Sequence, residues 1–327
     1  MALALAACGA SPSVLSPRTP EAGRINNLFL IMTAIATAVC LLIIGLLLAA
    51  WLRRRPDSAT VDLRRGPVPA HLLWVSGTTW IVGGGIAFPL VVLGVVFVLE
   101  LGVLNATPIS AGSSDLTIDV IGHQWWWEVR YPQLGIVTAN EIHIPAGQTV
   151  DVRLTTADVI HSFWVPELAP KLDLINSLTN TLTLTDVPPG QYRGQCAEFC
   201  GVQHALMGML VVAEPPAAFS AWAQQQAQPA ATPDGAQARQ GQQVFLSQQC
   251  VYCHTVRGTT AKGQLGPDLT HVASRQTLAA VTLLNTAGNL GGWVVDPQGL
   301  KPGNRMPHTE LTSEQLQLLL AYLENLK

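Results

Sequence analysis

The chain has 327 residues, enough for two or three domains that each bury a core. Hydrophobic residues make up 49% of the chain and charged residues only 12%, and the formal net charge is −3. This balance excludes an ordinary soluble protein of the same length and indicates that part of the chain lies in a membrane.

The N-terminal segment, residues 1–24, contains a candidate lipoprotein signal. Leu5-Ala6-Ala7-Cys8 resembles the bacterial lipoprotein cleavage box, which would make Cys8 a lipidated N-terminus. The apolar stretch before Cys8 is short and carries no basic residue, which is atypical of a signal peptide. The sequence is therefore compatible both with cleavage and lipidation at Cys8 and with an unprocessed N-terminus.

Two apolar stretches predict a transmembrane hairpin over residues 25–105. Residues 28–52 and 72–99 contain no charged side chain, and each stretch exceeds the about 20 residues that a spanning helix requires. We expect helices over about 28–52 and 72–101. The alternative, two buried core helices, usually shows a polar face. The loop between the stretches should be cytoplasmic by the positive-inside rule, because it contains Arg53, Arg54, Arg55, Arg64 and Arg65.

The composition changes after the hairpin. Residues 112–213 form short alternating stretches separated by turn residues, which favours an antiparallel sandwich or barrel. Residues 214–238 are rich in Ala, Gln and Pro and are typical of a linker that is partly helical at its start. Residues 239–327 show helical periodicity near both ends and predict a small all-α domain.

Charge is divided unevenly between these two domains. Residues 112–213 contain ten Asp and Glu against four Lys and Arg, a net charge of −6. Residues 239–327 contain seven Lys and Arg against five Asp and Glu, a net charge of +2. Opposite signs favour docking of the two domains on each other.

The C-terminal domain contains the Cys-x-x-Cys-His pattern of covalent haem c attachment, in Cys250, Cys253 and His254. The two thiols would hold the haem and His254 would be the proximal iron ligand. A zinc half-site or a redox pair is the alternative, but the adjacent histidine and the missing second half-site favour haem. We expect Met306 as the distal ligand, because a thioether raises the reduction potential, with His271 and His308 as competitors.

This domain resembles class I cytochrome c throughout, including Gly266-Pro267-Asp268-Leu269 after the haem motif. The resemblance implies that the Pro267 carbonyl accepts a hydrogen bond from the other ring nitrogen of His254, which would fix the imidazole. It also implies that Trp293 packs near a haem propionate.

A second concentration of ligands lies in residues 195–207, "QCAEFCGVQHALM", which contain two cysteines, a histidine and a methionine. Thiolate, imidazole and thioether groups together select copper over hard cations. A mononuclear blue-copper site needs one cysteine, and this loop offers a second. The alternative is a structural disulfide between Cys196 and Cys200.

With His161 upstream, this loop is similar to the dinuclear CuA site, and residues 25–213 resemble subunit II of haem-copper cytochrome c oxidases. The C-terminal extension is similar to that of bacterial oxidases whose subunit II carries its own cytochrome c. The resemblance implies a cupredoxin-like sandwich. It also implies a Mg²⁺ or Mn²⁺ ion bound by the Glu198 carboxylate and shared with subunit I. The implied copper ligands are His161, Cys196, Cys200, His204, Met207 and the backbone carbonyl of Glu198.

The segment "GHQWWWEVRY", residues 122–131, matches the aromatic segment of the same family. By that resemblance Trp125 is the residue through which electrons enter from an external cytochrome c. Three adjacent tryptophans also suit a membrane-interface belt, which is the alternative.

The sequence departs from the family pattern in two places. The start of the second helix has only His71 as an ionisable residue, where many members have a glutamate that helps proton entry. Asn176-Ser177 replaces a Pro-Gly turn near the copper loop. Lys171 and Asp173 match the face on which the family docks cytochrome c.

The resemblance implies the electron-entry subunit of a proton-translocating cytochrome c oxidase in the bacterial inner membrane, with both soluble domains on the periplasmic side. Electrons would pass from haem c to CuA and on to haem a and CuB in subunit I, where O₂ is reduced to water. This chain would hold no catalytic residue. The expected partners are subunits I and III, cytochrome c or another periplasmic donor, and the lipid bilayer, but no nucleic acid.

Two other functions stay open from the sequence alone. One is the electron-entry subunit of a CuA-containing nitric oxide reductase. The other is a free-standing membrane-tethered electron carrier or copper-delivery protein. A quinol oxidase subunit conflicts with the intact copper ligands.

Overall fold

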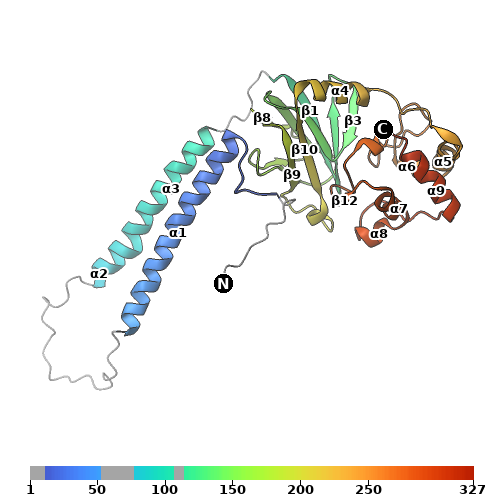
Figure 1. Ribbon diagram of the computed structural model, residues 1–327. Coiled ribbons are helices and arrows are strands. Elements are labelled where there is room, and N and C mark those ends of the chain that lie inside the picture. The colour runs from blue at the N-terminus through green and yellow to red at the C-terminus, as the bar shows by residue number, and fades with distance from the viewer. Residues whose placement is uncertain (1–11, 53–76, 107–113) are drawn as a thin grey trace, which may run out of the picture. The chain divides into compact units, whose positions relative to one another are not determined.

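The computed structural model describes residues 12–52, 77–106 and 114–327 (Figure 1). The chain divides into two compact units, Arg24–Thr107 and the combination of Met1–Gly23 with Pro108–Lys327. Three features of the sequence lie outside the described residues: Cys8, the arginine-rich loop and His71.

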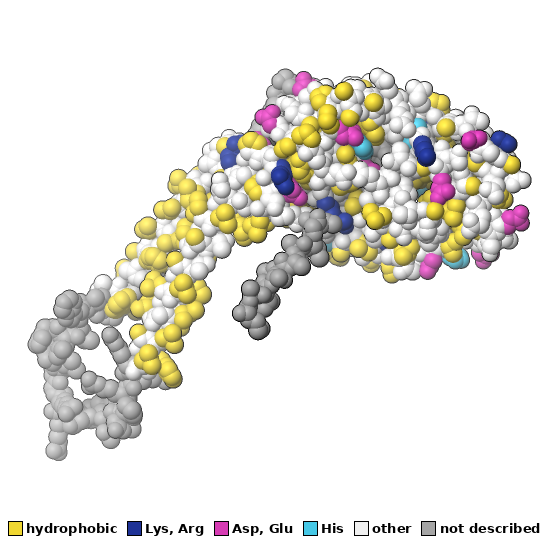
Figure 2. Space-filling view, viewed as in Figure 1, with side chains coloured by type: hydrophobic (Ala, Val, Ile, Leu, Met, Phe, Trp, Pro, Cys, Tyr) yellow, Lys and Arg dark blue, Asp and Glu magenta, His cyan; other side chains and the backbone are white. Residues whose placement is uncertain are grey.

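The first unit is built from two long apolar helices. Helix α1 spans Pro20–Leu52, and a continuous second helix spans Gly77–Asn105 as α2 (Gly77–Thr79), η2 (Trp80–Ala87) and α3 (Phe88–Asn105). Their mean hydropathy reaches 2.7 and 2.6, and both are long enough to cross a membrane. Figure 2 shows hydrophobic side chains over the surface of these helices.

The helix ends differ from those predicted. Helix α1 begins at Pro20 rather than near residue 28, because proline is well tolerated at a helix start and polar residues can extend a helix beyond its apolar stretch. Helix α3 ends at Asn105 rather than near residue 101, so Glu100 lies within it. The π-helical η2 precedes Pro89, whose ring disfavours regular hydrogen bonding in the turn before it.

The second unit begins with a β-sandwich of two five-stranded sheets, in the order β3-β2-β1-β5-β8 and β4-β10-β9-β6-β7. Alternate side chains of β1 are buried, and the core between the sheets includes Trp127, Tyr131 and Phe163. The strands are β1 (Leu116–His123), β2 (Trp126–Tyr131), β3 (Ile136–Ala139), β4 (Glu141–Pro145), β5 (Val150–Thr156), β6 (His161–Trp164), β7 (Leu172–Leu174), β8 (Asn180–Leu184), β9 (Gly190–Cys196) and β10 (Gly208–Glu214).

The predicted antiparallel sandwich or barrel is a sandwich, but not all of its strand pairs are antiparallel. Strand β1 pairs with β5 in parallel, and β4 pairs with β10 in parallel. Each parallel pair joins strands that are separated by other elements along the chain. Alternation of apolar and polar residues reports which face of a strand is buried but not which strand lies beside it, so this pairing was hidden in the sequence.

The predicted linker contains helix α4 (Pro216–Ala227), which packs on the sandwich. Trp222 stacks on His143 with ring centroids 4.2 Å apart and meets the edge of Tyr131 at 5.3 Å. His143 therefore lies beneath Trp222, and its Nδ1 is 3.1 Å from Oε2 of Glu214.

The C-terminal domain is mainly helical. Helices α5 and α9 cross closely, since a Cβ on Gly241 would lie only 1.9 Å from the Leu318 carbonyl oxygen. Phe245 and Tyr322 pack in the core between them. The short hairpin of β11 and β12 was not predicted. The elements are α5 (Gly235–Ser247), α6 (Cys250–Cys253), η4 (Val272–Ser274), β11 (Thr277–Leu278), β12 (Leu283–Leu284), α7 (Ala287–Val295), α8 (Pro297–Leu300) and α9 (Ser313–Leu323).

Candidate metal centre

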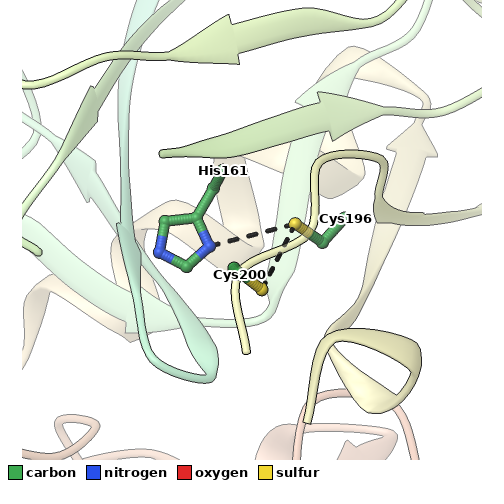
Figure 3. Close-up of side chains that lie close together, drawn as sticks. All are labelled: His161, Cys196 and Cys200. Carbon is green, nitrogen blue, oxygen red and sulfur yellow. Dashed lines mark hydrogen bonds between the residues drawn. The ribbon is translucent and has the colours of Figure 1, made fainter. Parts of the chain in front are cut away.

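His161, Cys196 and Cys200 meet at one end of the sandwich (Figure 3). His161 begins β6 and Cys196 ends the neighbouring strand β9, while Cys200 lies in the loop that follows. The two sulfurs are 3.7 Å apart, and Nδ1 of His161 lies 3.9 Å from Sγ of Cys196. The ligand atoms of all three lie within 4.8 Å of one another, and all three residues are buried, so the group could hold a metal ion.

The other predicted ligands surround the same two sulfurs. Nδ1 of His204, in η3 (His204–Leu206), lies 3.6 Å from Sγ of Cys200, and Sδ of the buried Met207 lies 3.8 Å from it. The Glu198 carbonyl oxygen is 3.2 Å from Sγ of Cys196, while the Glu198 side chain is exposed. The structure thus brings together all six residues that the sequence analysis grouped.

The two neighbouring cysteine thiols differ strongly in pKa. The neighbouring Cys200 thiol holds the pKa of Cys196 well below its usual value, whereas Cys196 and burial raise the pKa of Cys200. A first thiolate therefore forms easily and a second is costly until a cation compensates its charge. Two adjacent buried sulfurs favour binding of metal over a pair of free thiolates.

Asp158 was not identified from the sequence, although it lies only three residues before His161. Its Oδ1 is 2.9 Å from Nε2 of His161, which leaves Nδ1 facing Cys196. Burial raises the pKa of Asp158, but hydrogen bonds from His161 and the Gln124 backbone N–H outweigh burial and lower it. Gly122 leaves room for the ring, because a Cβ there would lie 2.7 Å from Cδ2 of His161.

Trp125 lies directly against residues 195–207, the predicted copper loop. Its Nε1 donates to the Cys200 carbonyl at 3.0 Å, and Nε2 of Gln124 donates to the same oxygen at 2.8 Å. The indole also fits over Gly201, where a Cβ would approach Cζ2 to 2.9 Å.

The turn at Asn176-Ser177, where the sequence departs from the family's Pro-Gly, is hydrogen-bonded to the candidate site. Ser177 takes a left-handed conformation with φ 65°, where the family has the glycine that tolerates it best. Nδ2 of Asn176 donates to the Asp158 carbonyl at 2.9 Å. This side-chain contact holds the turn close to the residue that orients His161.

In the C-terminal domain, His254 is oriented as the cytochrome resemblance implied. Its Nδ1 lies 2.7 Å from the Pro267 carbonyl oxygen, which leaves Nε2 for a ligand. A Cβ on Gly266 would lie 2.8 Å from Cε1 of His254, so glycine allows the loop to approach the ring. Both ring nitrogens of His271 face carbonyl oxygens, of Lys327 at 2.7 Å and Gln228 at 3.0 Å, so His271 does not compete as a haem ligand.

Comparison with known proteins finds a matching family for each of the two domains. The family described as cytochrome c oxidase subunit II, periplasmic domain, matches residues 133–214, and the cytochrome c family matches residues 238–327. Cytochrome c oxidase subunit 2 of Alkalihalophilus pseudofirmus is 33% identical, over 96% of this chain and 91% of that protein. Cytochrome c oxidase subunit 2 of Bacillus sp. (strain PS3) is 35% identical, over 65% of this chain and 62% of that protein. The periplasmic domain of subunit II of cytochrome oxidase from Bradyrhizobium japonicum is 28% identical, over 36% of this chain and 96% of that one, with a TM-score of 0.35.

These matches confirm the predicted fold class: two apolar helices, a cupredoxin-like sandwich and a cytochrome c domain. The cytochrome c match indicates haem c, and the subunit II match indicates copper. The helices indicate membrane anchoring, and a subunit of this kind associates with other oxidase subunits and with cytochrome c. The chain belongs to the cytochrome c oxidase subunit 2 family, the electron-entry subunits of haem-copper oxidases.

Proposed function

We propose that this chain delivers electrons from cytochrome c, through haem c and CuA, to the haem-copper site of subunit I for reduction of O₂ to water. The observation that carries the proposal is the set of donors around two sulfurs: two imidazoles, a thioether and a carbonyl lie within 3.2–3.9 Å of them. This soft, largely buried set fits copper rather than a hard cation.

The copper would be held by His161, Cys196, Cys200, His204, Met207 and the Glu198 carbonyl. When bound, the dinuclear centre supplies a single electron shared over two ions, with little change in geometry on transfer. The chain's own residues keep that geometry: Asp158 orients His161, and burial of both cysteines and Met207 excludes water.

The haem would be attached at Cys250 and Cys253, with His254 and Met306 as its axial ligands. The hydrogen-bonding contact of His254 with Pro267 supports the proximal role, because it fixes the ring and raises its basicity. Met306 is half-buried and its backbone is held by Asn304 and Gln298, which supports a fixed distal position.

Three further proposals concern the surroundings of the centre. The exposed Glu198 carboxylate, behind the carbonyl that faces the copper site, suits a Mg²⁺ or Mn²⁺ ion shared with subunit I. Trp125 suits electron entry, because its indole contacts the Cys200 carbonyl. We also propose that the chain lies in the bacterial inner membrane and belongs to a proton-translocating complex with subunits I and III. Its domains would span residues 25–105, 112–213 and 239–327.

The test is electron paramagnetic resonance and optical spectroscopy of the full chain, matured with haem c and loaded with copper. We expect a copper hyperfine pattern from an electron shared over two nuclei, beside a low-spin His–Met haem spectrum. Cys200→Ser should convert the copper signal to a mononuclear one, and Cys40→Ser, at an exposed position of α1, should leave it unchanged. A mononuclear signal in the unaltered chain would contradict CuA.

A further inference from the structure

The cytochrome domain contacts the β-sandwich on both sides of Met207. The backbone N–H of Gly208 donates to the Ala280 carbonyl at 3.2 Å. On the other side, Nζ of Lys301 donates to the Leu206 carbonyl at 2.8 Å. Both neighbours of a predicted copper ligand are therefore hydrogen-bonded to the haem-binding domain.

Lys301 joins the two domains through a buried ammonium group. Its side chain is only 3% exposed, and Nζ also donates to the Ala279 carbonyl of its own domain at 3.1 Å. Burial lowers the pKa of Lys301 to about 8. Burying a lysine is costly unless its donors are used, and one of its two acceptors comes from the copper loop.

Glu141, the first residue of β4, is the complementary group on the sandwich. Glu141 is only 2% exposed. Its carboxylate accepts three hydrogen bonds from the cytochrome domain. The donors are the backbone N–H groups of Gln276 and Thr277, at 3.1 and 2.8 Å, and Oγ1 of Thr277 at 2.6 Å. If the domain moved away, this site would lose all three donors.

The turn between β11 and β12 lies between these two charged groups. Ala279, Ala280 and Val281 all have left-handed backbones, with φ of 54°, 56° and 63°. Such a run is unfavourable for residues with a Cβ, above all for a β-branched valine. Val281 packs with Leu210 and Val212 of β10, so the contact with the sandwich stabilises the strained turn.

The connector is bonded to both domains as well. Trp222 of α4 packs on the sandwich. At the other end of α4, Nε2 of Gln226 donates to Oγ of Ser274 at 3.1 Å, and the Gln228 carbonyl faces His271. The connector therefore holds the domains together instead of acting as a free tether.

We propose that Glu141 and Lys301 form a clamp, two positioning residues that keep the cytochrome domain permanently docked on the copper loop. The inference rests on the proposed function. Docking places Arg305, the neighbour of Met306, in a hydrogen bond to Oε1 of Gln124, whose Nε2 donates to the Cys200 carbonyl. Electrons would thus cross a fixed interface, without a step in which the domain swings.

Hydrogen exchange of the full chain tests the clamp without any metal. The Gly208 amide should be protected in the unaltered chain, because its acceptor is the Ala280 carbonyl of the cytochrome domain. In Glu141→Ala with Lys301→Met, which leave that acceptor in place, its exchange should rise about tenfold or more, while amides of β5 stay protected and show that the sandwich is folded. The matched controls are Glu310→Ala and Lys262→Met, both at exposed positions of the cytochrome domain. An unprotected Gly208 amide in the unaltered chain, or no change in the double variant, would overturn the clamp.

The assembled oxidase gives the functional readout. After rapid reduction of haem c, electron transfer to copper should be independent of solvent viscosity in the unaltered complex. It should become slower and viscosity-dependent in the double variant, because docking then limits the rate. Viscosity dependence in the unaltered complex would overturn the inference. If hydrogen exchange rises in the double variant as expected, but the unaltered chain gives no dinuclear copper signal in electron paramagnetic resonance, the proposed function is wrong and the clamp is still supported.

Discussion

Asp158 lies outside the predicted ligand set but orients one of the predicted ligands, His161. It fixes the His161 ring from behind and accepts a hydrogen bond from the Gln124 backbone N–H at 2.7 Å. Asp158→Asn should lower copper affinity by about 10- to 100-fold, because the amide is a weaker partner for the imidazole. Competition with a copper chelator measures the change.

The control for that variant is Asp186→Asn, which makes the same substitution at an exposed turn position. Equal copper affinity in Asp158→Asn and the unaltered chain would show that the His161 ring is held by its strand alone.

Glu128 gives a residue-scale prediction on pH. Its carboxylate lies 3.0 Å from Nε2 of His123 and accepts from Nε of Arg130 at 2.6 Å. Burial raises the pKa of Glu128, but these two hydrogen bonds outweigh burial and hold the pKa below 4.5. The folded chain thus binds fewer protons here than the unfolded chain, so ionised Glu128 contributes stability above pH 4.5 that is lost as pH falls through the folded pKa.

Glu128→Gln should therefore lower the free energy of unfolding by about 1–2 kcal/mol at pH 7. The difference from the unaltered chain should shrink on acidification below the folded pKa. Denaturant unfolding across pH measures it, with Glu324→Gln at an exposed position as the control. A difference that grows on acidification would contradict the assigned contacts.

The sequence revealed the candidate ligands but missed the residues that position them. Cys196, Cys200, His204 and Met207 lie within one loop, so their spacing alone indicates a site. Asp158, Glu141 and Lys301 act through partners on other elements, and Lys301 has backbone carbonyls as partners, which no sequence pattern reports.

At the scale of elements, helix α4 is the part whose role differed most from expectation. Trp222→Ala should destabilise the chain by about 3 kcal/mol, because it removes the rings' contacts with His143, Tyr131 and Phe219. Thermal unfolding measures the loss, and Gln224→Ala, at an exposed position of α4, should have little effect. If Gln224→Ala lost as much stability as Trp222→Ala, the stabilisation would come from the helix as a whole and not from its tryptophan.

The prediction of the elements succeeded where a local pattern exists. Uncharged apolar stretches located both long helices, and alternation located the β-rich region, residues 112–213, as a whole. The parallel pairs β1–β5 and β4–β10 and the docking of α4 depend on contacts between distant segments. An Ala- and Gln-rich segment such as residues 216–227 gives little periodic signal, although Phe219 and Trp222 anchor it.

At the scale of the whole molecule, the clamp couples the stability of the two soluble domains. We expect the sandwich and the cytochrome domain of the full chain to unfold in one calorimetric transition. Glu141→Ala with Lys301→Met should split it in two, because each domain then unfolds with its own stability. Two transitions in the unaltered chain would show that the interface is too weak to couple them.

The opposite net charges of the two domains predicted their docking but not its mechanism. Glu141 and Lys301, two buried charges of the interface, do not pair with each other; each is bonded by polar groups of the other domain. Net charge reports long-range attraction, whereas the contact itself depends on where single hydrogen-bonding groups fall.

The short segment between α4 and α5, residues 228–234, is mostly exposed. A protease that cut it would leave two fragments that still migrate together through a sizing column, since the interface and not the peptide bond holds them. The gene could then be divided at this point into two reading frames, and the separately made cytochrome would find its place on the copper subunit as an ordinary non-covalent partner.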